Sequence, residues 1–214
     1  MKRILITKEI LLVLAPHPDD ESLGCGGMIA KIIEEGGNVF ILVFTKNYAK
    51  DSNYKEFHKA INVLGIPAKN CFYTSFDDQT LKLDQVGLKN IIFRIEEVCN
   101  IINPTIVAIP FIKSFHQDHE VVGKAAMTAL RPHGYMSKKV LIYEQPYYGT
   151  WSTEFFKPNY YIDITNYLGK KIDSLLCYES QKIPFDMVTA MAKVRGYEVG
   201  RQMAEAYMLM REII

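Results

Sequence analysis

Apolar residues occur along the chain in two patterns, short continuous runs and longer stretches with helical spacing. A continuous apolar run is typical of a strand that is buried on both faces. Four such runs predict strands and a shorter one predicts a fifth: residues 10–14, 39–44, 105–109, 140–143 and 71–74. Apolar residues at positions i, i+3, i+4 and i+7 predict amphipathic helices, which fall at residues 25–33, 57–64, 88–102 and 122–129.

The C-terminal residues 186–211 predict one long helix, interrupted at Gly196 and Gly200. Because strands alternate with helices along the chain, we expect βαβ units and therefore an α/β fold. The expected architecture is a single Rossmann-like domain over residues 1–214, with a mostly parallel sheet and helices on both faces. The sequence contains no internal repeat, and the aromatic stretch 144–159 is not typical of a linker between domains.

Charge and composition narrow the class of protein. Lysine and arginine total 25 against 24 acidic residues, a balance that argues against a nucleic-acid-binding protein. No stretch approaches the ~18 apolar residues that span a bilayer, so we expect no integral membrane segment and a cytoplasmic protein. The four cysteines form no C-x-x-C pair, which favours buried thiols in a reducing compartment: Cys25, Cys71, Cys99 and Cys177.

Charged residues gather where the first predicted strand ends, at His17-Pro18-Asp19-Asp20-Glu21. In an open α/β sheet, ligands bind beyond the carboxyl ends of the strands. Like charges this close repel one another, and a divalent cation would resolve the repulsion. Histidine nitrogen and aspartate oxygen are ordinary zinc ligands. One of the two aspartates can bind a metal while the other faces the metal-bound water; a solvated acidic turn is the alternative.

A second group, His116-Gln117-Asp118-His119, follows the predicted strand 105–109. Two strand-end clusters on one parallel sheet can converge, so we expect His17, Asp20 and one of these histidines to surround a single ion. The other histidine would then donate protons. Asp118 either hydrogen-bonds the ring of a ligand histidine or caps the following helix. Two exposed histidines at the start of a helix are the alternative interpretation.

Glycines 24, 26 and 27 follow the first motif, in a turn and at the start of the next predicted helix. Gly24 and Gly26 match the start of a dinucleotide-binding fingerprint, but Ile29 occupies its third glycine position. The neighbouring acids would also repel a pyrophosphate. We therefore expect these glycines to allow close packing of the helix on the sheet.

Together the residues resemble a known family. The segment Ala15-Pro16-His17-Pro18-Asp19-Asp20-Glu21 resembles the A-H-P-D-D-E signature of the LmbE-like (PIG-L) N-acetylglucosamine deacetylases, and the second motif resembles their H-x-D-H. The resemblance covers nearly the whole chain, through Glu56, Ala60, Leu64-Gly65, Asp78 and Leu81 to Ser180-Gln181, Arg195-Gly196 and Ala204-Glu205.

The resemblance implies specific roles for the motif residues. It implies that His17, Asp20 and His119 bind zinc, although iron(II) or cobalt suits the same ligand set. Asp19 would be the general base, and His116 would face the developing charge or the leaving amine. Asp118 would support the ligands from just outside the metal site.

Two departures from the family pattern concern the substrate. The family often has an arginine shortly before the glutamate matched by Glu56, where this chain has Asn53-Tyr54-Lys55, and the common aspartate-glycine is Asp78-Gln79. We expect substrate contacts from Asp78, Tyr54 and Trp151. Trp151 belongs to an aromatic segment that either stacks on a sugar or packs over the sheet.

The implied reaction is removal of the acetyl group from a small N-acetylglucosamine-type conjugate, with release of acetate and a free amine. A metal-dependent amidase for a non-sugar or thiol-conjugate amide is the alternative enzyme. A non-catalytic sugar-binding relative is the alternative from another class, and the presence of Asp19 and both motif histidines weighs against it. The sequence leaves open whether the chain forms a homo-oligomer.

Overall fold

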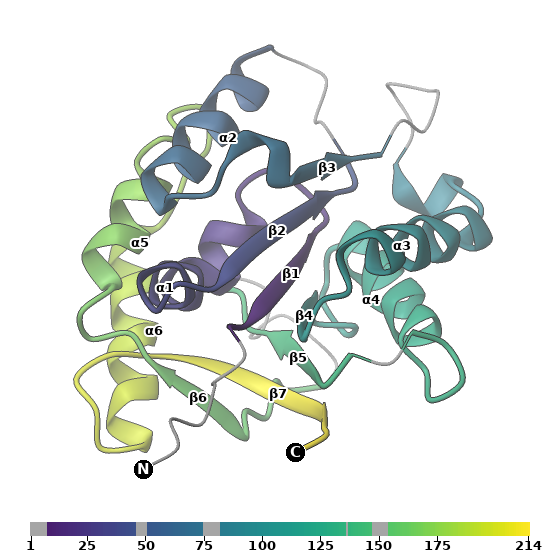
Figure 1. Cartoon of the computed structure of the whole chain (residues 1–214). Helices are drawn as coiled ribbons and strands as arrows, with labels where there is room; N and C mark the ends of the chain where they lie inside the picture. The colour runs from purple at the N-terminus through teal and green to yellow at the C-terminus, as the bar shows by residue number, and fades with distance from the viewer. Residues whose placement is uncertain (1–7, 46–50, 75–81, 136, 147–153) are drawn as a thin grey trace.

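Strands from both halves of the chain form one mixed sheet in the computed structural model, which describes residues 8–45, 51–74, 82–135, 137–146 and 154–214 (Figure 1). Within these residues the strand order is β3-β2-β1-β4-β5-β7-β6. Strands β1 to β5 are parallel, and β7 is antiparallel to both β5 and β6, which confirms the predicted mostly parallel sheet. The strands are β1 (Ile10–Ala15), β2 (Asn38–Val43), β3 (Cys71–Tyr73), β4 (Ile106–Pro110), β5 (Lys139–Tyr143), β6 (Tyr160–Asp163) and β7 (Ala204–Glu212).

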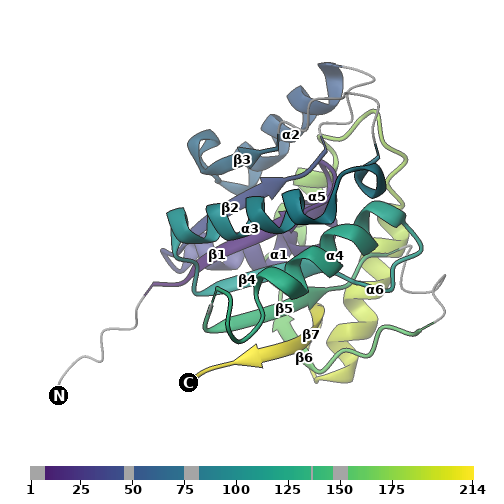
Figure 2. The same cartoon turned by 90° about the vertical axis from the view of Figure 1, so that its right-hand side faces the viewer.

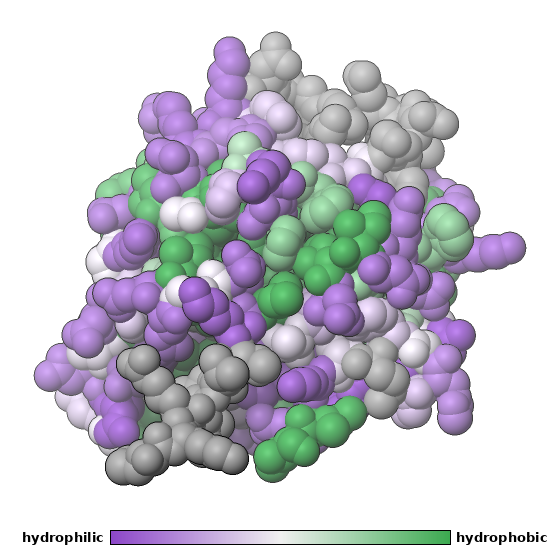
Figure 3. Space-filling view, in the orientation of Figure 1, coloured by the Kyte–Doolittle hydropathy of each residue, from purple (hydrophilic) through white to green (hydrophobic). Residues whose placement is uncertain are grey.

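Helices cover both faces of the sheet, as predicted. Figure 2 shows α3 (Leu88–Ile102) and α4 (Gln117–Ala129) on one face. The other face carries α1 (Asp20–Glu34), α2 (Asp51–Leu64), α5 (Leu168–Leu175) and α6 (Phe185–Glu198) (Figure 1). Hydrophilic side chains form much of the surface, and apolar areas remain visible near the middle of one face (Figure 3). Among the described residues, every helix is too short or too polar to cross a membrane.

Strand β1 explains why a continuous apolar run is a reliable signal in this fold. Leu11 and Val13 belong to the core between the sheet and α1, whereas Leu12 and Leu14 belong to the core beneath α3 and α4. All four side chains are fully buried. A strand with helices on both faces needs apolar residues at every position, which is the pattern that the sequence shows.

The prediction of one long helix over residues 186–211 is wrong. Helix α6 ends at Glu198, Gly200 adopts a φ of +68°, and the chain returns as β7. A Cβ atom on Gly196 would lie 2.7 Å from the carbonyl of Gln202, so the returning chain packs directly on the helix. Residues 204–212 are rich in helix formers, but pairing with β5 and β6 outweighs local propensity. The apolar pattern also fails to predict β6 and α5, which have only 4 and 8 residues.

Helix α1 packs so closely on its neighbours that three of its glycines leave no room for a side chain. A Cβ atom on Gly24 would lie 2.4 Å from the ring of Tyr143. The corresponding distances are 2.9 Å from Gly26 to the Lys171 side chain and 2.5 Å from Gly27 to Ile164. The Gly24 contact confirms close packing of the helix on the sheet, whereas Gly26 packs on α5 and Gly27 on the residue that follows β6.

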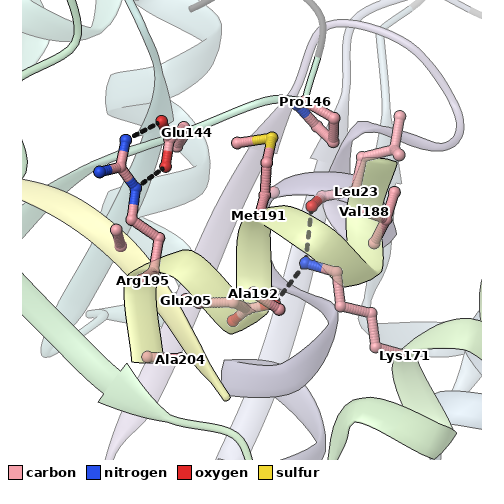
Figure 4. A pocket seen from close by; sticks show the side chains of 12 residues that line it. Leu23, Glu144, Pro146, Lys171, Val188, Met191, Ala192, Arg195, Ala204 and Glu205 are labelled. Carbon is pink, nitrogen blue, oxygen red and sulfur yellow. Dashed lines mark hydrogen bonds and ion pairs between the residues drawn. The ribbon is translucent and has the colours of Figure 1, made fainter. Parts of the chain in front are cut away.

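A buried ion pair also ties α1 to the C-terminal half of the chain (Figure 4). Lys171 Nζ lies 2.7 Å from Glu205 Oε1 and donates to the Leu23 carbonyl at 2.8 Å. The Glu205 carboxylate accepts the backbone N–H groups of Gly27 and Met28 at 2.8 and 2.7 Å. In a regular α-helix the N–H of residue 27 pairs with the C=O of residue 23. Lys171 thus bonds the C=O of residue 23, and Glu205 accepts the N–H of residue 27. These are the two backbone groups that pair with each other in a regular helix.

Replacing Lys171 with methionine should lower the free energy of unfolding by roughly 3–5 kcal/mol, because Glu205 would stay buried without its cation. The matched control is Lys170→Met, which removes the neighbouring exposed lysine of the same helix. It should change the free energy by less than about 0.5 kcal/mol. Guanidinium unfolding followed by circular dichroism measures both values, and equal losses in the two variants would contradict a stabilising role for the buried pair.

Candidate metal and catalytic site

Two strand–helix junctions lie side by side at the carboxyl edge of the sheet. One joins β1 to α1 and the other joins β4 to α4. Because β1 and β4 are neighbouring parallel strands, both junctions lie at the same edge. The structure thereby brings five residues of the two motifs together: His17, Asp20, His116, Asp118 and His119.

Asp20 lies at the centre of this cluster and is only 2% exposed. Its Oδ2 atom lies 3.3 Å from His17 Nδ1 and 3.3 Å from His119 Nε2, and it accepts the backbone N–H of His17 at 2.8 Å. Donor atoms that bind a tetrahedral zinc ion at about 2.0–2.1 Å lie roughly 3.3–3.4 Å from one another. The two distances from Asp20 Oδ2 therefore fit a zinc ion held by these three side chains. The other carboxylate oxygen, Oδ1, accepts a hydrogen bond from Gln145 Nε2.

Burial excludes the two alternative interpretations of these motifs, a solvated acidic turn and a pair of exposed histidines. Glu21 is fully buried, and its Oε1 atom accepts hydrogen bonds from the hydroxyls of Ser22 at 2.7 Å and Tyr178 at 2.6 Å. With Asp20 also buried, the first motif is not a solvated acidic turn. His119 is 1% exposed, so the second motif is not a pair of exposed histidines.

Asp19 precedes α1 in a strained backbone conformation, with φ 119° and ψ −29°. Non-glycine residues rarely adopt such angles, which cost about 1–3 kcal/mol and occur where the surroundings fix the backbone. Here the Asp19 N–H donates to Glu21 Oε2 at 3.1 Å. Burial raises the pKa of the Asp19 carboxyl well above its usual range, and the negative charge of Asp20 raises it further.

Asp118 holds the imidazole of His17. Its Oδ2 atom lies 2.9 Å from His17 Nε2, and its Oδ1 atom accepts the N–H of Leu83 at 3.0 Å. The residue that caps α4 is His116, whose Nδ1 accepts the backbone N–H of Asp118 at 3.3 Å. Of the two roles predicted for the Asp118 side chain, the structure therefore shows the hydrogen bond to a histidine. This contact fixes the His17 ring with Nδ1 towards Asp20.

The histidines of the cluster differ in charge. Burial lowers the pKa of His17, but hydrogen bonds to Asp118 and Asp20 outweigh burial and raise it to about 10. Burial lowers the pKa of His119 to about 4 and also lowers that of His116. Burial disfavours ionised Asp20, but its interactions with His119 and His17 lower its pKa to about 2. At neutral pH the metal-free site thus holds one protonated histidine, His17, beside an ionised Asp20.

His116 competes with Asp20 for the position of third metal ligand. One nitrogen of each histidine lies within 4.8 Å of a nitrogen of the other two. The His116 ring lies 4.7 Å from that of His17 and 5.0 Å from that of His119, measured between centroids. We favour Asp20, because its oxygen lies 3.3 Å from a nitrogen of each of the other two side chains and its negative charge offsets that of a cation.

The residues expected to contact a substrate are placed less completely. Asp78 and Trp151 lie outside the described residues. Tyr54 is 45% exposed on α2, with its ring centroid 4.4 Å from His58 and 5.5 Å from Tyr73. Tyr73 ends β3, two strands from β1, or about 10 Å across the sheet. The structure therefore places Tyr54 at the edge that carries the cluster but outside the cluster itself.

Where the family often has an arginine, this chain has a segment of α2 that forms hydrogen bonds with Ser180. Ser180 Oγ lies 2.8 Å from Asn53 Oδ1 and 2.6 Å from Glu56 Oε2, and the Ser180 N–H donates to Glu56 Oε1 at 3.1 Å. Asn53 and Glu56 are both buried. This part of α2 therefore joins the helix to the segment that precedes α6.

The sequence pattern does not identify Gln145 as a site residue. Gln145 follows β5 by two residues, is 4% exposed and contacts Asp20. It obeys the rule that polar side chains at the carboxyl ends of parallel strands form sites. The aromatic composition of residues 144–159 obscures this signal.

The chain matches the family model for PIG-L, GlcNAc-PI de-N-acetylase, over residues 12–130, which include both motifs. A relative from Bacillus anthracis, named probable N-acetyl-alpha-D-glucosaminyl L-malate deacetylase 2, is 27% identical over 192 residues. That match covers 80% of this chain and 80% of the relative.

Solved structures share the fold. The N,N'-diacetylchitobiose deacetylase from Pyrococcus horikoshii, in complex with its inhibitor, is similar with a TM-score of 0.75 and 20% identity, over 94% of this chain and 84% of the other. GalB, the 4-carboxy-2-hydroxymuconate hydratase from Pseudomonas putida, is similar with a TM-score of 0.77 and 19% identity, over 96% and 98%. Because a deacetylase and a hydratase both have this fold, the fold alone does not specify the reaction.

Zinc binding should release about one proton per chain at pH 7, because His17 must lose its proton to become a ligand. His17 is protonated below its pKa of about 10. The apparent zinc affinity should therefore rise about tenfold per pH unit between pH 6 and pH 8. Calorimetry in buffers of different ionisation enthalpy measures the released proton. Asp118→Asn should weaken the pH dependence, and a pH-independent affinity in the unmodified chain would contradict a protonated His17.

Proposed function

The chain belongs to the PIG-L family of de-N-acetylases, and on this premise we propose that it is a zinc-dependent hydrolase. The proposed reaction removes the acetyl group from an N-acetylglucosamine-type conjugate and releases acetate and a free amine. The donor set around Asp20 carries the proposal, since its Oδ2 atom lies 3.3 Å from a nitrogen of both His17 and His119. A second carboxyl, that of half-buried Asp19, is adjacent in sequence and suits a base.

His17, Asp20 and His119 are the proposed zinc ligands. One carboxylate and two neutral imidazoles leave a divalent ion with a net positive charge, which favours a negatively charged transition state. When bound, the ion supplies Lewis-acid chemistry, which polarises a carbonyl oxygen and makes water more acidic. Iron(II) or cobalt in the same ligand set would supply similar chemistry.

Asp19 is the proposed general base. Its raised pKa means that the carboxylate keeps a proton firmly once it has accepted one from the attacking water. The hydrogen bond from its backbone N–H to Glu21 limits the movement of the turn, so the carboxylate stays in place during the reaction. Buried Glu21 is itself held by Tyr178, which links this turn to the segment after α5.

His116 is the proposed hydrogen-bond donor to the acetyl oxygen. Burial and the nearby charge of His17 lower its pKa, so the ring is neutral at pH 7. Because Nδ1 accepts the N–H of Asp118, the ring proton lies on Nε2. A neutral N–H donor stabilises the negative charge that develops on the oxygen. His116 uses its ring proton for that hydrogen bond and does not protonate the leaving nitrogen. Asp19 therefore delivers to this nitrogen the proton that it took from the attacking water.

Small amino-sugar conjugates are the proposed substrates. The names of two relatives state N-acetylglucosaminyl malate and diacetylchitobiose as substrates. We propose that Tyr54, at the same edge of the sheet, contacts the part of the conjugate beyond the acetylated sugar, since an exposed aromatic ring suits a pyranose face. Asp78 and Trp151 remain proposed substrate contacts on the basis of the sequence.

Asp19→Asn should lower kcat/KM for amine release by about 10²–10⁴, because asparagine keeps the shape of the side chain but accepts no proton. The measurement uses zinc-loaded chain and a panel of N-acetylglucosamine conjugates. The control Asp173→Asn removes an exposed carboxylate of α5 and should leave the rate unchanged. A second panel contains non-sugar amides. Release only from this second panel would favour the amidase alternative, and release from no member of either panel would favour a binding role.

Histidine variants separate a metal ligand from a hydrogen-bond donor. His119→Gln should lower zinc affinity by more than about 100-fold. His116→Gln should keep zinc affinity within about threefold and lower kcat by about 10²–10³. Zinc affinity is measured by competition with a chromophoric chelator. Equal losses of zinc in the two variants would make His116 the third ligand in place of Asp20.

A further inference from the structure

Successive side chains hold the segment that follows β5. The Tyr143 hydroxyl donates to the carbonyl of Leu14 at 2.9 Å. Arg195 donates to both oxygens of Glu144, from Nε at 2.8 Å and from Nη2 at 2.5 Å, as Figure 4 shows. These contacts fix the backbone just before Gln145 against β1 and α6. The backbone from which the Gln145 side chain projects therefore has a fixed position.

Gln145 and the histidines contact different oxygens of Asp20. The Gln145 amide donates from Nε2 to Oδ1. Oδ2 accepts the backbone N–H of His17 and lies 3.3 Å from the ring nitrogens of His17 and His119. One oxygen thus has a neutral donor as its partner, and the other faces the candidate metal ligands.

We propose that Gln145 is a positioning residue that makes Asp20 bind the metal ion through Oδ2 alone. This inference rests on the metal site of the proposed function and not on its substrate. A carboxylate whose oxygens are both unrestrained can bind one ion through the two together, as in many calcium sites. A hydrogen bond that holds Oδ1 favours binding through one oxygen. The resulting low ligand number suits zinc, which prefers four ligands, over larger cations that prefer oxygen.

The chemistry of an amide suits this position better than that of a charged side chain. A lysine or arginine beside Asp20 would compete with the metal ion for the carboxylate, and an acid would repel it. The amide donates at any pH and leaves the charge of the site unchanged. Gln145 is also 4% exposed, so little solvent competes for its hydrogen bond.

Gln145→Met tests the proposal, because methionine is close to glutamine in size and cannot donate. Zinc affinity, measured by chelator competition, should fall by about 10–100-fold. The visible absorption of the chain loaded with Co²⁺ should weaken, because cobalt absorbs less when its ligand number rises. The matched control is Asn70→Leu, which removes another buried amide, one that donates to the Val39 carbonyl at 3.0 Å. Val39 lies near the start of β2, away from the site, so zinc affinity and the cobalt spectrum should not change.

Unchanged zinc affinity and an unchanged cobalt spectrum in folded Gln145→Met would overturn the proposal. Gln145→Asn, which is too short to reach Oδ1, has the same expected result if the methionine variant does not fold. A high-resolution structure of the zinc-loaded wild-type chain is independent of both variants. It should show Asp20 bound through Oδ2 with Gln145 on Oδ1, and an ion bound by both oxygens would overturn the proposal.

These measurements separate Gln145 from the rest of the proposed function, because none of them uses a substrate. Zinc bound as described without amine release from any conjugate would contradict the proposed reaction and support the role of Gln145. A wild-type chain that binds no zinc would overturn both.

Discussion

The buried carboxylate of Glu205 is the contact on which the position of α1 depends. It accepts hydrogen bonds from the backbone of Gly27, 178 residues away in sequence, and from Lys171. A buried carboxylate is costly unless it is paired and hydrogen-bonded. Helix α1 therefore cannot shift along its neighbours without leaving a charge unpaired in the interior. Since α1 begins at Asp20, the same contact fixes where the candidate metal ligand lies. A C-terminal strand thus determines the geometry of an N-terminal motif.

The turn before α1 has several features that lower the stability of the fold and that a purely structural turn would not need. Asp19 has a strained backbone, and two neighbouring acids, Asp20 and Glu21, are almost fully buried. Part of the cost is offset locally, because carboxylates near a helix N-terminus interact favourably with the helix dipole. Glu21 also has the hydroxyl of Tyr178, and Asp20 has protonated His17. A metal ion would take over the role of that proton, which is why binding and deprotonation are coupled at this site.

The parallel part of the fold follows from the sequence because helices cover both faces of its strands and leave continuous apolar runs. The two motifs converge as predicted because the ends of neighbouring parallel strands meet at one edge. The same reasoning does not predict the strand at residues 204–212. Its conformation comes from pairing with β5 and β6 and opposes the local preference for a helix. The sequence pattern does not identify Gln145 as a site residue either. Its partner Asp20 lies 125 residues away, and the aromatic composition around Gln145 obscures its position after a strand.

Three neighbouring strand ends supply the surroundings of Asp20. His17 follows β1, His119 follows β4, and Gln145 follows β5. Adjacent strands lie about 4.8 Å apart, so residues that follow three neighbouring strands, directly or on the first turn of the next helix, can meet at one point. The candidate metal ligands thus lie just after central strands or on the first turns of α1 and α4, whereas the proposed substrate contact Tyr54 lies on α2, with its ring beside Tyr73 of the edge strand β3. Loops and helices can change around a sheet while its strand ends keep their positions. A scaffold shared by a deacetylase and a hydratase is what this separation would produce, because the reaction then depends on which side chains the strand ends carry.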